Sequence, residues 1–192
     1  MNKVIQRRFG TSPRLSLSNL DWLEHGMHAK TVRFDIGQGG EPPSVTWEDR
    51  SAAIALIDSS AAKSLASLLL WGGDEKWDWA VHFNEVVGYL AKAMLQQCRI
   101  DGRQAPKGSE YSLEELARLM ARMTLHFELY DLWSLYTVEG RLLFSGINVS
   151  ASTYSQVWAG YQKAMLDNVG VLAGAINIAV HTYRRNLDEA RT

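Results

Sequence analysis

Residues 141–158 read RLLFSGINVSASTYSQVW, in which a short apolar segment is followed by a turn and then by a second amphipathic segment. Asparagine is one of the few non-glycine residues that tolerates a left-handed backbone, so we expect the corner at Asn148. Ser150 can cap the second helix by accepting a hydrogen bond from the backbone N–H of residue 152 or 153. Four apolar side chains would hold the two helices together: Ile147, Val149, Tyr154 and Val157. The pattern predicts a helix-turn-helix at about 141–163.

The second helix of this motif would expose short polar side chains that can hydrogen-bond base edges or phosphates in a major groove. These are Ser152, Thr153, Ser155, Gln156 and Gln162, with Arg141 and Lys163 adding positive charge. Gln156 is the best base-reading candidate, because its amide both donates to and accepts from adenine. Phe144 departs from the pattern, since alanine or glycine usually stands where the helices cross. A plain α-hairpin without nucleic-acid contact is the alternative.

The charge of the chain gives no global attraction to nucleic acid. The 192 residues carry a net charge of −1, with a pI of about 6.5, and 46% of them are hydrophobic, which favours a folded globular protein. Residues 1–14 hold four basic residues and no acid, 51–139 hold eight basic against twelve acidic residues, and five basic face three acidic residues from 140 onward. This layout suits DNA contact at one end and protein contact in the middle, and it equally suits an ordinary protein with a slightly uneven surface charge.

The remaining pattern predicts a mainly α, multi-helix single domain. Residues 1–44 would form a basic N-terminal arm (1–16), a short helix after Ser18 or Asn19, a lone strand near 31–36, and a linker at 37–43 that marks a boundary. The helical domain would then span 45–192. Capping boxes at Thr46/Asp49 and Ser112/Glu115 would begin two of its helices. Further helices are expected at 60–71, from Asp74, through 113–133, and from the turn to Val180, where Gly170 and Gly174 favour a break.

No pattern of catalytic or metal-ligating residues stands out. Cys98 is the only cysteine, which excludes a thiolate zinc cluster, and His25 and His28 stand near a single carboxylate, that of Glu24. The Gly-rich run at 37–40 lacks the lysine of a phosphate-binding loop. We therefore expect no enzyme, no metal and no cofactor. No apolar run reaches the ~18 residues of a membrane span, and no signal peptide is visible, so the expected location is the cytoplasm.

The C-terminal part resembles the Q-type transcription antiterminators of lambdoid phages. That family carries a pattern like N-[LV]-[ST]-x-x-T-[WY]-S-[RQ], and here residues 148–156 read NVSASTYSQ, followed by Tyr161 and Ala164. The resemblance covers roughly the last 75 residues. It departs from the best-known members in having no cysteine-rich zinc element, because residues 133–139 bridge that gap.

The resemblance implies a phage protein, acting in the host cytoplasm, that binds duplex DNA at a late promoter. It would load onto paused RNA polymerase and carry it through terminators, with polymerase or sigma factor as the protein partner. The alternative is a helical module that binds a host or phage protein without touching DNA. A third class, an enzyme on a helical scaffold, has no site that can be named.

Overall fold

The computed structural model describes residues 18–24, 45–71, 77–106 and 111–191, and within these ranges the chain is mainly helical and has no strand. The elements are α1 (Ser18–Glu24), α2 (Trp47–Ala55), α3 (Ser60–Trp71), α4 (Trp79–Ile100), α5 (Leu113–Leu129), η1 (Trp133–Leu135), α6 (Val138–Phe144), α7 (Ala151–Thr153), η2 (Tyr154–Trp158) and α8 (Ala159–Arg191). The expected mainly α class is confirmed. The basic arm at 1–16, the strand at 31–36 and the linker at 37–43 lie outside the described residues.

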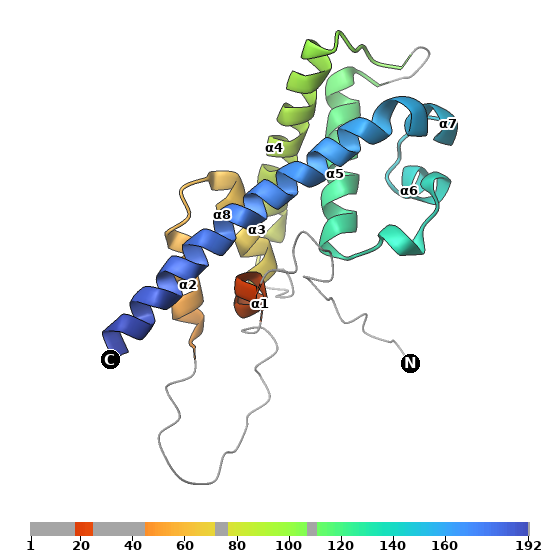
Figure 1. Cartoon of the computed structure of the whole chain (residues 1–192). Helices are drawn as coiled ribbons and strands as arrows, with labels where there is room; N and C mark the ends of the chain where they lie inside the picture. Colours follow the sequence, from red (N-terminus) through yellow and green to blue (C-terminus); the bar gives the residue numbers. More distant parts are fainter. Residues whose placement is uncertain (1–17, 25–44, 72–76, 107–110, 192) are drawn as a thin grey trace, which may run out of the picture.

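Helix α8 is the element against which most others pack. It runs across the molecule and meets α1 to α5 on one side (Figure 1). Its buried residues include Met165, Val169, Leu172, Ile176 and Val180, which recur at helical spacing and belong to one continuous core. Gly170 and Gly174 do not interrupt it, because packing along the core face outweighs the weak helix propensity of glycine.

Helices α4 and α5 pack on each other, and α3 packs on α4. Both expected capping boxes are present: Asp49 N–H donates to Thr46 Oγ1 at 3.2 Å, and Glu115 N–H donates to Ser112 Oγ at 3.1 Å. Helix α5 ends at Leu129, earlier than the expected 133, because Asp131 takes a positive φ of 49° and the chain turns into η1. Asp78 caps α4, so the described helix begins after it and not at Asp74.

Helix α1 belongs to the same core as the C-terminal helices. Leu20 and Leu23 are fully buried, and Asn19 Nδ2 donates to Asn177 Oδ1 on α8 at 2.9 Å. Arg184 of α8 donates in turn to Asn19 Oδ1 at 2.7 Å. The described helix of the N-terminal piece is therefore part of the helical domain, and the expected boundary near residue 44 does not separate it from that domain.

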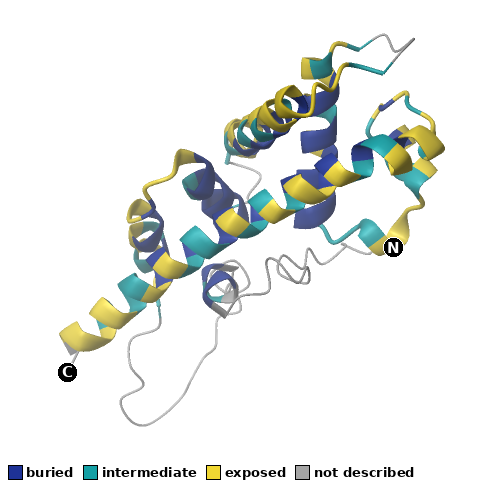
Figure 2. Cartoon of the chain, turned by 45° about the horizontal axis from the view of Figure 1, so that its top comes forward, coloured by how far each residue is buried: buried dark blue, intermediate teal, exposed yellow. Residues whose placement is uncertain are grey.

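The helix that continues from α7 to α8 is apolar enough to raise the question of a membrane. An 18-residue window within Ala151–Ala190 has a mean hydropathy of 1.3, and 39% of that window is buried inside the protein. By length and composition alone this helix could cross a bilayer, whereas the sequence led us to expect no apolar run of ~18 residues. The core helix of a soluble protein meets the same criteria. Figure 2 shows exposed and buried turns alternating along it.

Candidate nucleic-acid interface

The turn between α6 and α7 is closed by glycine and not by asparagine. Gly146 has a φ of 68°, whereas Asn148 is absent from the described residues with positive φ, so the expectation of a left-handed Asn148 was wrong. The backbone N–H of Gly146 donates to Leu143 and that of Ile147 to Leu142, at 3.2 and 2.9 Å. These bonds satisfy carbonyls at the end of α6, as a left-handed glycine just past a helix commonly does.

The second helix begins as the sequence predicts. Thr153 N–H donates to Ser150 Oγ at 3.1 Å, so Ser150 is the N-cap. Tyr154 is buried and Val157 is half-buried against the core, as expected. Trp158, which the pattern did not single out, is 1% exposed and is among the largest fully buried side chains. The start of this helix is therefore fixed by a cap and by two aromatic anchors.

Residues Tyr154–Trp158 form a π turn, in which the N–H of Ala159 donates to the carbonyl of Tyr154. A π turn contains more residues than an α turn, so it rotates the residues that follow it relative to those before it. This rotation explains one wrong expectation. Gln162 was placed on the exposed face, but it is 8% exposed, and its Oε1 accepts a 2.6 Å hydrogen bond from Tyr154. Gln162 is therefore removed from the set of possible DNA contacts.

The other polar residues of the second helix are exposed. Ser152, Thr153, Ser155, Gln156 and Lys163 all face solvent. Gln156 Nε2 donates to Ser152 Oγ at 3.3 Å, and the Thr153 hydroxyl accepts from Ser150 at 2.8 Å. Arg141 is only half-buried, with its guanidinium 5.4 Å from the Trp133 ring centroid and its Nε donating to Thr137 O. The turns at 151–163 thus present a polar surface with little charge of their own.

Positive charge comes to this end of the molecule from the loop after α4, which sequence reasoning missed. Tyr161 donates to Asp101 Oδ2 at 2.7 Å, and a hydrogen bond between Tyr161 and Arg103 raises the pKa of that guanidinium. Arg99 and Arg103 are both exposed. The loop is distant in sequence from the motif, so only the tertiary structure shows that Arg103 lies near Tyr161.

A second basic patch lies in a hollow between α4 and α5, whose volume is about 620 Å³. Arg118 and Arg122 line it together with Glu115 and Tyr111, among other residues. The Tyr111 hydroxyl donates to the carbonyl of Gly146 at 2.6 Å, which joins the rim of this hollow to the turn of the motif. The two arginines are exposed and could contact an anion.

An exposed apolar patch lies on η1 and α6, and we define it as Leu135, Tyr136, Leu143 and Phe144. Leu143 is 85% exposed, Leu135 71%, Phe144 55% and Tyr136 38%. Phe144 contacts the Phe127 ring edge-on and the His126 ring face-on, with centroids 5.6 and 5.4 Å apart. Burial lowers the pKa of His126 from its ordinary value of 6.5. Phe144, where the expected motif usually has a small residue, is exposed at the end of α6.

The described residues hold no group of three or more His, Cys, Asp or Glu side chains that could bind a metal ion. Cys98 is buried, and burial raises the pKa of its thiol. No family model, curated protein or solved structure matches this chain.

Proposed function

We propose that the chain is a DNA-binding transcription regulator, similar to the phage antiterminators, whose helix after Ser150 enters the major groove of duplex DNA. The observation that carries this proposal is the row of exposed short polar side chains on a rigidly capped helix start. Four such residues, Ser152, Thr153, Ser155 and Gln156, occupy the first two turns. The cap at Ser150 and the buried Tyr154 and Trp158 would hold them in fixed positions.

The proposed roles follow from the chemistry of each side chain. Gln156 reads a base through its amide, while Ser152 and Ser155 donate to phosphate oxygens. Lys163 supplies charge from the turn that follows the π turn, and Arg103, which contacts Tyr161, supplies further charge. Two or three cations imply modest affinity, because phosphate neutralisation provides most of the non-specific binding energy.

The proposed protein partner is RNA polymerase or its sigma factor. Support for it comes from the resemblance of residues 148–156 to the antiterminators and from the excess of acidic residues between 51 and 139. In this proposal the motif places the protein at a promoter in the cytoplasm of the host, and the helical middle contacts the enzyme.

A helical interaction module that binds a protein and no DNA is the second candidate. The exposed apolar patch on η1 and α6 favours it, because isolated exposed leucines are ordinary but four large apolar side chains around one corner are not. The rotation caused by the π turn also separates Gln156 from Lys163, which a single continuous helix would place on one face.

A mobility shift with random-sequence duplex DNA at two salt concentrations distinguishes these candidates. A phosphate-contacting protein loses affinity steeply as salt rises. Absence of a shift at both salt concentrations would refute the DNA proposal and leave the interaction module.

Substitutions within the motif test the assigned roles. We expect Lys163→Ala to weaken binding to every duplex and to lower the slope of log K against log salt by roughly 1. Once a preferred site is known, Gln156→Ala should cost ~1–3 kcal/mol there and spare random DNA. Lys92→Ala and Gln96→Ala, exposed on α4, are the matched controls. If the control substitutions lowered DNA affinity as much as those in the motif, the motif would not be the binding surface.

A further inference from the structure

The face of α8 that points away from the core carries two large apolar side chains in its middle. Val171 and Ile178 are 66% and 67% exposed, although they lie in the middle of a long helix whose opposite side is already packed. A surface helix normally carries charged or polar residues there. We define the α8 stripe as a line of residues that follow one another every three or four positions: Lys163, Asp167, Val171, Gly174, Ile178, His181, Arg185 and Glu189.

Contacts within the molecule do not explain why residue 174 is a glycine. A Cβ added at this position would meet no heavy atom within 4 Å, so the fold does not need glycine there for close packing. Glycine within a helix costs roughly 0.5–1 kcal/mol relative to alanine. A residue without a side chain at this position leaves room for a side chain from outside, next to two exposed apolar residues.

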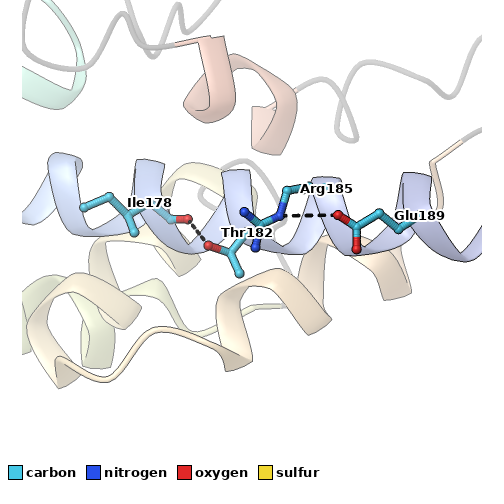
Figure 3. A network of polar contacts seen from close by, with 4 residues as sticks. All are labelled: Ile178, Thr182, Arg185 and Glu189. Atoms are coloured by element: carbon cyan, nitrogen blue, oxygen red, sulfur yellow. Dashed lines mark hydrogen bonds and ion pairs between the residues drawn. The ribbon is translucent and has the colours of Figure 1, made fainter.

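The charges of the α8 stripe are arranged to pair with a reversed copy of themselves. Lys163 and Asp167 lie at one end of the stripe. Arg185 and Glu189 lie at the other end, where Figure 3 shows them on α8 with Ile178 earlier on the same helix. In an antiparallel pair centred on residue 176, Lys163 and Glu189 each lie thirteen residues from the centre, so they face each other across the pair. The same register places Asp167 opposite Arg185, since both lie nine residues from the centre.

This register also fits the apolar part of the stripe. Gly174 and Ile178 each lie two residues from the centre, so the Ile178 side chain of one copy would occupy the space above Gly174 of the other. Within one chain, Arg185 and Glu189 form an ion pair of 3.7 Å with side chains 62% and 71% exposed. Such an exposed pair is weak, so both charges can also pair across an interface.

We propose that the α8 stripe is a self-association surface, on which a second copy of this chain packs its own α8 in antiparallel orientation about residue 176. The interface is two-fold symmetric, so each contact occurs twice. Its apolar centre provides the burial, and its charged ends select the antiparallel register over the parallel one, in which like charges would face each other. This surface shares only Lys163 with the proposed DNA contacts and needs no DNA to form.

Sedimentation velocity of the full chain without DNA tests the proposal. We expect a dimer at tens of micromolar protein, and Ile178→Asp should raise the dimer dissociation constant by more than about tenfold. Val81→Asp is the matched control, because Val81 is 63% exposed on α4 and lies outside the stripe. Both variants should keep the melting temperature of the monomer, since neither side chain is in the core.

Cysteine cross-linking tests the orientation. Val171 and His181 each lie five residues from residue 176, and the native Cys98 is buried. Mixed Val171→Cys and His181→Cys chains should form a disulfide-linked dimer on mild oxidation, with much less from either variant alone. Cross-linking of Val171→Cys to itself, and not to the other variant, would show a parallel pair and overturn the proposed register.

Three further outcomes would overturn self-association itself. These are a monomeric wild-type chain at this concentration, an Ile178→Asp chain that dimerises as tightly as wild type, and a monomer that co-sediments with phosphatidylcholine vesicles. The last outcome would assign the stripe to a lipid surface. Because Asp167, Val171, Ile178 and Arg185 have no proposed DNA role, loss of DNA binding and loss of the dimer are separate results.

Discussion

At the scale of single residues, the start of the second helix is held by buried polar atoms that satisfy one another. Burial raises the pKa of the Tyr154 hydroxyl, which stays protonated and donates to Gln162 Oε1. A buried amide without such a partner would cost roughly 1–3 kcal/mol. Trp158 Nε1 lacks a hydrogen-bond partner, so this anchor contributes through apolar contact. The hydrogen bond from Tyr154 thus stabilises Gln162 in the buried position that follows the π turn.

His126 should make stability depend on pH. Its pKa is lowered by burial, so the unfolded chain binds a proton more readily than the folded chain does. The contribution of the neutral ring is present above pH 6.5 and is lost as the pH falls through the lower folded-state pKa. Melting temperatures should therefore fall between pH 7.5 and pH 5, and His126→Asn should reduce that dependence. If the melting temperatures of the wild type and of His126→Asn depended on pH in the same way, the role assigned to His126 would be wrong.

At the scale of elements, two local features shape the motif: a left-handed glycine at its corner and a π turn near the start of its second helix. Gly146 closes α6, and the π turn at Tyr154–Trp158 rotates everything C-terminal to it. Neither feature belongs to a regular helical pattern. Together they decide which polar residues of 151–163 share a face.

The glycine can be tested by a pair of substitutions. Gly146→Ala should destabilise the protein by ~1–2 kcal/mol, because alanine at φ 68° places its Cβ too close to the backbone. Gly88→Ala should stabilise it by ~0.5–1 kcal/mol, since Gly88 lies within α4 and its added Cβ meets nothing within 4 Å. Urea unfolding midpoints give both values. If both substitutions moved the urea midpoint in the same direction, the left-handed backbone at residue 146 would not require glycine.

At the scale of the whole molecule, one core joins α1 to the C-terminal helices. Tyr183 donates to Asp49 Oδ1 at 2.8 Å, and Arg50 Nε donates to the carbonyl of Trp22, so α1, α2 and α8 are also linked by polar contacts. The motif is therefore carried on a helix whose far end is fixed by residues near the start of the described chain.

Leu20→Ala should lower the free energy of unfolding by ~2–5 kcal/mol, because Leu20 is 1% exposed within this core. Leu143→Ala, at 85% exposure, is the control and should stay within about 0.5 kcal/mol of wild type. Thermal or urea unfolding measures both. A Leu20→Ala loss as small as that of the control would show that α1 does not contribute to the core.

The sequence by itself determined the features that depend on neighbouring residues. The helical class, the two capping boxes and the Ser150 cap follow from local hydrogen bonding and apolar spacing, and all are present. Burial of Tyr154 followed from the same spacing.

The tertiary structure decided what depends on contacts distant in sequence. Packing against the core sets the π turn, which buried Gln162, and it brings the Arg103 loop beside Tyr161. The left-handed residue is Gly146 and not Asn148, because the chain turns at the second residue after the end of α6 at Phe144. Where two local backbone conformations have similar free energies, contacts with residues distant in sequence determine which one forms.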